Sequence, residues 1–167
     1  MKTVVAFKDV LIRTELVPGD LGYVIHMHGK LYRKEYNYGI HFESYVASGI
    51  HEFCESLGSS RSRGWIAEQN GKIVGFLALM DRGDQAQLRY FILDPSVRGI
   101  GLGRKLIELY MDYLKASGFK GSYLLTTKEL PAAAHLYMSQ GFKLKEEHPV
   151  HHPFDKDVIE QRYELTL

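Results

Sequence analysis

The sequence has a single cysteine, Cys54, which excludes an internal disulfide and a metal site built from a cysteine cluster. It also lacks an excess of charge, because 21 lysines and arginines balance 20 aspartates and glutamates and leave a net charge of +1. This balance gives no electrostatic reason to expect nucleic acid or a membrane surface as a partner.

Long apolar runs, internal repeats and low-complexity tracts are missing as well. Without a signal-peptide pattern or a membrane-spanning run, we expect a cytoplasmic protein. No linker-like stretch interrupts the chain, so residues 1–167 are expected to fold as one domain. The chain is 45% hydrophobic and 25% charged, which is ordinary for a globular protein with a core of its own.

Strand-like and helix-like patterns alternate along the chain. The dipeptide Asn70-Gly71 lies between two apolar runs, which is the strongest short-range signal for a β-hairpin. Residues 40–57 carry apolar side chains at three- to four-residue spacing and predict a helix. In residues 20–36 the helical pattern is weaker, because two glycines interrupt it and residues 23–25 could equally be extended.

The order of these patterns predicts the fold class. We expect an α/β protein, a single domain with a mixed sheet in the order β-α-α-β-β-β-α-β-α-β-β. The predicted strands are 3–16, 65–68, 72–79, 85–93, 123–126, 142–146 and 158–165, and the predicted helices are 20–36, 40–57, 102–117 and a short helix opened by Pro131.

A glycine-rich loop, Arg98-Gly99-Ile100-Gly101-Leu102-Gly103, separates a predicted strand from a predicted helix. Its glycines allow backbone N–H groups to approach a ligand, and the helix start supplies unpaired donors and the positive end of a dipole. Arg98 adds a cation that can bind phosphate oxygens. The spacing matches neither a P-loop nor a good dinucleotide fingerprint. The loop predicts a pyrophosphate site, and the alternative is a plain glycine-rich turn.

A second motif lies downstream, where Leu136-Tyr137-Met138-Ser139-Gln140-Gly141-Phe142 ends the short helix. Together the two motifs resemble the GNAT N-acetyltransferase superfamily, whose pattern is (Gln/Arg)-x-x-Gly-x-(Gly/Ala) followed by Leu-Tyr-x-x-x-Gly-Phe. Leu130 departs from this pattern, because the family often has asparagine there, and Thr127 or Lys128 could supply the polar contact instead. The matching residues are Arg98, Gly101 and Gly103 in the first motif and Leu136, Tyr137, Gly141 and Phe142 in the second.

The resemblance implies an acetyl-CoA-dependent N-acetyltransferase that works without a metal. The acetyl group would move to a small-molecule or peptide amine by direct attack in a ternary complex, and a homodimer is left open. Transfer of a longer acyl group, or a non-catalytic module that binds or senses acetyl-CoA, is the alternative. By resemblance, the backbone of the strand before the loop holds the pantetheine and the acetyl carbonyl. The expected coenzyme-binding residues are Phe91, Ile92, Leu93, Arg98, Gly99, Gly101, Leu102, Gly103 and Arg104.

Tyr137 is the candidate general acid. The resemblance places a tyrosine at this position beside the coenzyme sulfur, where the hydroxyl could protonate the departing thiolate. The alternative is a tyrosine that only packs the short helix against the sheet. Cys54 has no evident activating partner, so no covalent intermediate is implied.

The base is not carried over from the family, because the strand before the loop holds no carboxylate. If the N-terminal segment is helical, His28, Tyr32 and Glu35 share one face. We therefore predict that His28 accepts the amine proton and that Tyr32, Glu35 and Arg89 contact the acceptor. The alternative is that His28 is a satisfied core histidine, with the base supplied by Glu35, Glu52 or an ordered water chain.

Residues 19–46 and 146–154 also look like the acetyltransferase half of bacterial proteins that fuse a MarR-type regulator to a GNAT domain. The chain is too short to hold a winged-helix regulator as well, so it would be a stand-alone version. The spacing of His148, His151 and His152 is not that of a standard zinc site, and two nearby prolines favour a loop beside the acceptor cleft.

Overall fold

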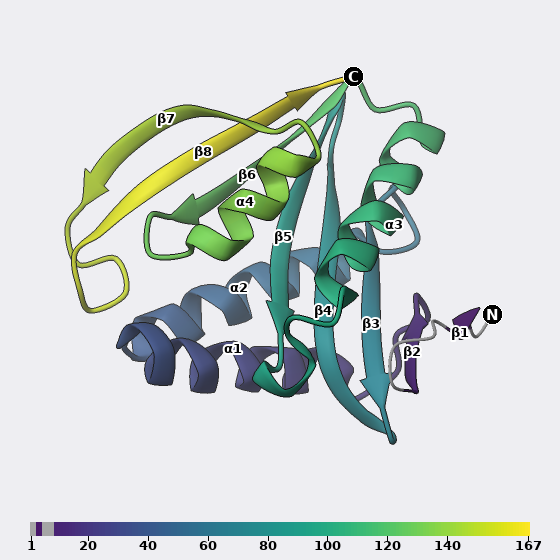
Figure 1. Ribbon diagram of the computed structural model, residues 1–167, viewed down its shortest axis with the longest axis horizontal. Coiled ribbons are helices and arrows are strands. Elements are labelled where there is room, and N and C mark those ends of the chain that lie inside the picture. The colour runs from purple at the N-terminus through teal and green to yellow at the C-terminus, as the bar shows by residue number, and fades with distance from the viewer. Residues whose placement is uncertain (1–2, 5–8) are drawn as a thin grey trace.

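The computed structural model describes residues 3–4 and 9–167, which form a mixed sheet covered by helices on both faces. The eight strands follow the order β1-β2-β3-β4-β5-β6-β8-β7. Helices α1 and α2 cover one face of the sheet, and α3 and α4 cover the other (Figure 1). The strands are β1 Thr3–Val4, β2 Val10–Arg13, β3 Arg63–Gln69, β4 Lys72–Arg82, β5 Gln85–Leu93, β6 Gly121–Thr127, β7 Lys143–Val150 and β8 Val158–Thr166, and the helices are α1 Asp20–Tyr36, α2 Ile40–Ser56, α3 Leu102–Ala116 and α4 Pro131–Ser139.

The predicted α/β fold with a mixed sheet is confirmed, and so is the hairpin. Asn70 and Gly71 both have positive φ, 52° and 75°, as a tight β3–β4 turn requires. One difference lies at the N-terminus, where two short antiparallel strands, β1 and β2, replace the single predicted strand over residues 3–16. Residues 5–8 of that prediction lie outside the described residues.

Helix α1 is continuous over Asp20–Tyr36, so the extended alternative for residues 23–25 is wrong. Tertiary contacts hold its first turn, because Asp20 accepts hydrogen bonds from Arg13 of β2 and from the Val17 amide. The helix ends at Asn37, which adopts a left-handed conformation. His28, Tyr32 and Glu35 follow one another at four- and three-residue spacing, so they share one side of this helix.

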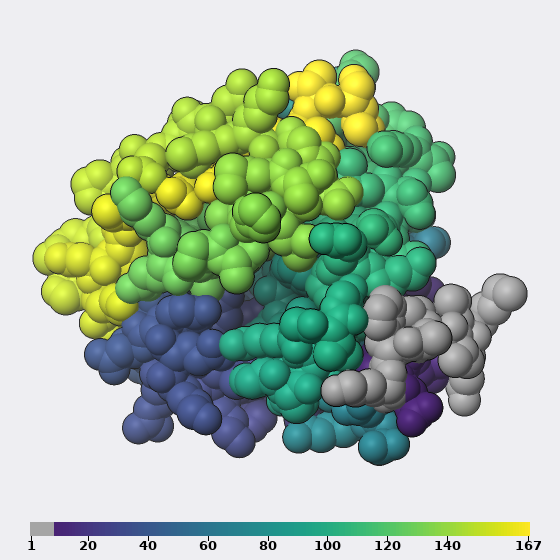
Figure 2. Space-filling view, viewed as in Figure 1, coloured from purple at the N-terminus to yellow at the C-terminus, as the bar shows by residue number. Residues whose placement is uncertain are grey.

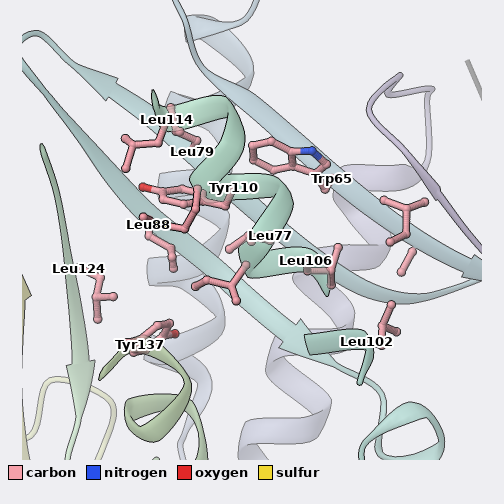
Figure 3. Close-up of a cluster of buried hydrophobic side chains, with 14 of the residues drawn as sticks. Trp65, Leu77, Leu79, Leu88, Leu102, Leu106, Tyr110, Leu114, Leu124 and Tyr137 are labelled. Carbon is pink, nitrogen blue, oxygen red and sulfur yellow. The ribbon is translucent and has the colours of Figure 1, made fainter. Parts of the chain in front are cut away.

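Helix α3 is strongly amphipathic, and its apolar side packs on the sheet. The buried residues Leu102, Leu106 and Tyr110 meet Trp65 and Leu77 of the neighbouring strands (Figure 3). The Tyr110 hydroxyl is satisfied by Ser122 Oγ at 2.7 Å. This packing fixes the start of α3 and therefore the position of the glycine-rich loop.

Strands β5 and β6 pair over three residues only, from Gln85 opposite Gly121 to Gln87 opposite Tyr123. Beyond this point the two parallel strands separate (Figure 1). The register between β4 and β5 also shifts here, because Ala78 pairs with Arg89 and Phe76 pairs with Ile92. Tyr90 is the extra residue of this bulge and has a φ of 58°. The sheet therefore opens in its middle.

The C-terminal hairpin is longer than predicted, and the prediction that His148 lies in a loop is wrong. His148 and the following proline belong to β7, where they pair with Glu160 and Ile159 of β8. A proline is tolerated here because β7 is the outermost strand of the sheet. Only His151 and His152 lie in the turn that follows. Within the described residues, no helix is both long and apolar enough to span a bilayer.

Candidate functional site

A cleft of about 680 Å³ opens where β5 and β6 separate. Figure 2 shows the surface hollowed where α4, the start of α3 and the α1–α2 segment come together. The cleft reaches both faces of the sheet, because its lining comes from all four helices and from both strands. Every residue predicted for the site lines it except Leu102.

The glycine-rich loop forms one end of the cleft. Gly99 and Gly101 have φ values of 74° and 90°, and a Cβ on Gly99 would meet no atom within 4 Å. Gly103 is enclosed instead, since its Cβ would lie 3.2 Å from Leu93. In the part of the chain that the structure describes, no side chain caps the start of α3. The first amides of α3 thus face an open, backbone-lined cradle that fits a pyrophosphate.

Leu102 is the exception among the predicted coenzyme residues. Its side chain is fully buried in the core under α3 and does not line the cleft, so only its backbone could meet the coenzyme, and its predicted binding role stays a prediction. The reason is helical periodicity, because the first residue of α3 faces the sheet while its neighbours face the cleft.

Arg98 is held by Glu35, which the sequence does not reveal. Its Nη1 and Nη2 donate to the two Glu35 carboxylate oxygens, each at 2.7 Å, and its Nε and Nη2 donate to the Leu93 carbonyl. This bidentate pair holds the pKa of Glu35 below its usual range. It also connects α1 to the loop across the cleft.

Tyr137 comes from α4 and lies at the edge of the buried cluster (Figure 3). Its ring is 95% buried and contacts Phe91, Phe142 and Tyr163, with ring centroids 6.2–6.4 Å apart. Burial raises the pKa of its hydroxyl well above the usual value, so the group keeps its proton at neutral pH. The position suits a hydrogen-bond donor as well as a packing residue.

His28 is buried under three aromatic rings, those of Tyr32, Phe42 and Tyr90. Its Nδ1–H donates to the Val24 carbonyl at 2.8 Å, which makes Nε2 the acceptor nitrogen of the neutral ring. Desolvation lowers the pKa of His28 to about 4. A ring with this pKa is a weak proton acceptor, so its burial counts against the predicted base role, which stays a prediction.

Tyr32 and Arg89 line the middle of the cleft. Tyr32 stacks on Phe42 at 4.5 Å, and burial raises the pKa of its hydroxyl. The Arg89 side chain is only 12% exposed. Arg89 Nη2 donates to the Tyr45 hydroxyl at 3.1 Å, and its guanidinium lies 4.6 Å from the centre of the Tyr90 ring.

The sequence did not reveal several residues that line the cleft, because no local pattern indicates the β5 bulge or the β7–β8 turn. The bulge turns Tyr90 toward α2, and the β7–β8 turn places Phe154 against Tyr38 and Tyr45. Thr127, one of the two suggested substitutes for the family asparagine, lines the cleft and hydrogen-bonds to the Tyr38 hydroxyl at 2.9 Å. The number of tyrosines, 11 in 167 residues, was the only available hint.

The β7–β8 turn carries a small cluster of polar side chains outside the cleft. One ligand atom from each of His151, His152 and Asp157 lies within 4.8 Å of the others, and all three residues are exposed. Asp157 holds the cluster together, because its carboxylate lies 2.7 Å from His151 Nδ1 and accepts a hydrogen bond from the His152 amide. The prediction that the protein uses no metal stays a prediction.

Comparison with known proteins relates this chain to acetyltransferases. The model of the acetyltransferase (GNAT) family matches residues 27–142. N-acetyltransferase family 8 member 3 of Rattus norvegicus is 30% identical over 113 residues, which cover 61% of this chain and 50% of that protein. The chain thus spans about half the length of the curated relatives that it matches.

Solved structures agree in fold. The crystal structure of an acetyltransferase from Streptococcus agalactiae 2603 superposes with a TM-score of 0.73 and 27% identity, covering 96% of this chain and 100% of that chain. An acetyltransferase from Bacillus anthracis str. Ames, solved in complex with acetyl coenzyme A, superposes with a TM-score of 0.59 and 22% identity over 69% of this chain and 68% of that chain.

Proposed function

The chain belongs to the acetyltransferase (GNAT) family, and from this premise we propose that it transfers an acetyl group from acetyl-CoA to a primary amine. Direct attack of the amine in a ternary complex is the proposed route. The observation that carries the proposal is the cleft itself. The glycine cradle, the exposed edge of β5 and the Tyr137 ring all border one opening in the sheet.

The cradle supports the coenzyme part of the proposal. Gly99 leaves open space beside the start of α3, Gly101 precedes α3 in a left-handed conformation, and Arg104 adds a cation to the same end of the cleft. Phe91, Ile92 and Leu93 lie beyond the last β5–β6 pair, so their backbone groups on that side are not used by β6. These groups are proposed to hold the pantetheine arm.

Acetyl-CoA would supply an activated thioester. The protein's own contribution is then to place the amine, to exclude water and to manage two protons. Tyr137 is proposed to give a proton or a strong hydrogen bond to the sulfur, because burial keeps its hydroxyl protonated. His28 remains the predicted base, with a water chain as the alternative that its burial favours.

Two measurements test the proposal. Calorimetry with acetyl-CoA should show binding at one site per chain, and thiol release with a panel of amines should show turnover. Binding without turnover on any amine would favour the alternative of a non-catalytic coenzyme-binding module. Faster turnover with a longer acyl-CoA would favour the other alternative, transfer of a longer acyl group. The resemblance to regulator-fused acetyltransferases, the homodimer and the cytoplasmic location stay predictions.

A further inference from the structure

We propose that Arg89 and the aromatic side chains beside it form a subsite for a small primary amine that also carries a carboxylate and an apolar group. An apolar α-amino acid has this chemistry. The inference rests on the proposed acetyl transfer and names the acceptor class that this cleft would take.

The first argument is position. Arg89 follows the last paired residues of β5 and β6 by two positions, so it stands where the sheet opens. Because Tyr90 is an extra residue in the bulge, Arg89 and Tyr90 both face the α1–α2 layer instead of opposite faces. Leu88 and Phe91 on either side pack toward α3 and α4. The bulge therefore brings a guanidinium to the side of the opening away from α3 and α4.

The second argument is that Arg89 is built into its place. Its Nη2 donates to the Tyr45 hydroxyl, and its guanidinium lies over the Tyr90 ring. Both Nη2 and the Tyr90 hydroxyl occupy the space that a Cβ at Gly49 would take. A guanidinium that is fixed in this way loses little conformational entropy when it binds a carboxylate.

The third argument is charge. The carboxylate nearest to Arg89 is Glu52, which is already hydrogen-bonded to Arg82 through its other oxygen. Arg89 approaches Glu52 only to 3.7 Å, which is too long for a hydrogen bond. The guanidiniums of Arg82 and Arg89 thus share the single carboxylate of Glu52. These three side chains together carry one net positive charge beside the cleft. Of the two carboxylates that line the cleft in the described residues, Glu35 is bound to Arg98, and Glu160 comes from β8 rather than from the α1–α2 side on which Arg89 lies.

This excess of positive charge favours an acceptor with an anion and disfavours a simple cationic amine such as a polyamine. The neighbouring wall is aromatic, because Phe154 packs on Tyr38, Phe42 and Tyr45 at centroid distances of 5.0–5.3 Å. The turn that carries Phe154 is fixed by a hydrogen bond from the Gly39 amide to the Phe154 carbonyl at 2.9 Å. A fixed apolar wall beside a fixed cation matches an apolar amino acid.

Four amines separate the possibilities in a thiol-release assay. L-phenylalanine carries the carboxylate, and 2-phenylethylamine lacks it. L-phenylalaninamide has an uncharged amide in its place and represents a peptide N-terminus. Spermidine represents the polyamines. Rates are compared per unit of neutral amine. We expect kcat/KM for L-phenylalanine to exceed that for each of the others by about 10- to 100-fold, the range of one charged hydrogen bond.

Variants then assign the preference to Arg89. Arg89→Met should abolish it mainly through KM, and Arg89→Lys should recover part of it. Acetyl-CoA affinity should not change. Arg63→Met is the matched control, because Arg63 also lies over a tyrosine ring, that of Tyr113, but outside the cleft. Phe154→Ala should raise KM for L-phenylalanine more than KM for L-alanine.

Equal rates on L-phenylalanine and 2-phenylethylamine, or the same preference in wild type and Arg89→Met, would overturn the subsite. Binding of acetyl-CoA with no turnover of any carboxylate-bearing amine overturns it too, while leaving the coenzyme site intact. A chain that fails to bind acetyl-CoA would instead refute the proposed function, and the subsite with it.

Discussion

At the scale of single residues, Tyr137 has two candidate roles, packing and proton donation. Only proton donation needs its hydroxyl group, so removing that group distinguishes the two. Tyr137→Phe keeps the ring contacts with Phe91 and Phe142 and removes only the hydroxyl. We expect kcat to fall on the order of 10²-fold, the low end for general acid catalysis, with little change in acetyl-CoA affinity. Steady-state kinetics and calorimetry on the same preparation check this. Wild-type turnover in the variant would make Tyr137 a packing residue.

His28 provides a prediction about stability and pH. Its pKa is about 4 in the folded protein and 6.5 ordinarily, so the unfolded chain binds the proton more tightly. The stabilising contribution is therefore complete above pH 6.5 and is lost as the pH falls toward 4. Between pH 7 and pH 5 the loss amounts to about 2 kcal/mol.

The measurement compares wild type with His28→Phe, which keeps an aromatic ring among Tyr32, Phe42 and Tyr90. Urea unfolding at pH 7 and pH 5 should show a smaller drop in the free energy of unfolding for the variant. If both proteins lose the same amount, the folded ring binds a proton as readily as the unfolded one, and the base role of His28 gains support.

At the scale of elements, the loop before α3 depends on backbone rather than side chains. Gly101→Asp should abolish acetyl-CoA binding, because a carboxylate would enter the cradle where the first α3 amides point. Gly71→Asp is the matched control, since Gly71 has a positive φ as Gly101 does, but lies in the β3–β4 turn. Calorimetry should show unchanged affinity for the control. Equal affinity in a folded Gly101→Asp protein would remove the coenzyme assignment.

Helix α2 rests on the β5 bulge through Gly49. A Cβ at this position would collide with the Tyr90 hydroxyl, so Gly49→Ala should lower the free energy of unfolding by about 1–3 kcal/mol despite its better helix propensity. The Tyr90 hydroxyl is buried and has no hydrogen-bond partner among the described residues. Tyr90→Phe should therefore be neutral or stabilising alone and should rescue Gly49→Ala. Urea unfolding of the two single variants and the double variant measures this coupling, and additive effects would contradict it.

At the scale of the whole molecule, two hydrophobic clusters lie on opposite faces of the sheet, one under α3 and α4 and one under α1 and α2. The cleft runs between them where β5 and β6 part, and the Glu35–Arg98 pair crosses it. A ligand in the cleft would contact both halves and stabilise the folded state by mass action.

Acetyl-CoA at about 100 times its Kd should add about 2.7 kcal/mol to the free energy of unfolding. For a chain of this size, that corresponds to a rise in Tm of about 5–10 °C. Thermal unfolding monitored by circular dichroism tests this, with the Gly101→Asp protein as the control that should not respond. A wild-type Tm that ignores saturating acetyl-CoA would contradict the proposed site.

The sequence by itself determined the order of the elements from α1 onward, the β3–β4 turn, the glycine-rich loop before α3 and the place of Tyr137 on α4, because these depend on local periodicity and on turn chemistry. Only the tertiary structure decided the β5 bulge, the pairing of Arg98 and the burial of His28. The bulge at Tyr90 follows from the pairing register of β5 with β4, and the Arg98–Glu35 pair joins residues 63 positions apart. The burial of His28 depends on rings from α1, α2 and β5 together. Contacts between segments this distant leave no periodic trace in the chain, so the shape of the α1–α2 side of the cleft came from packing alone.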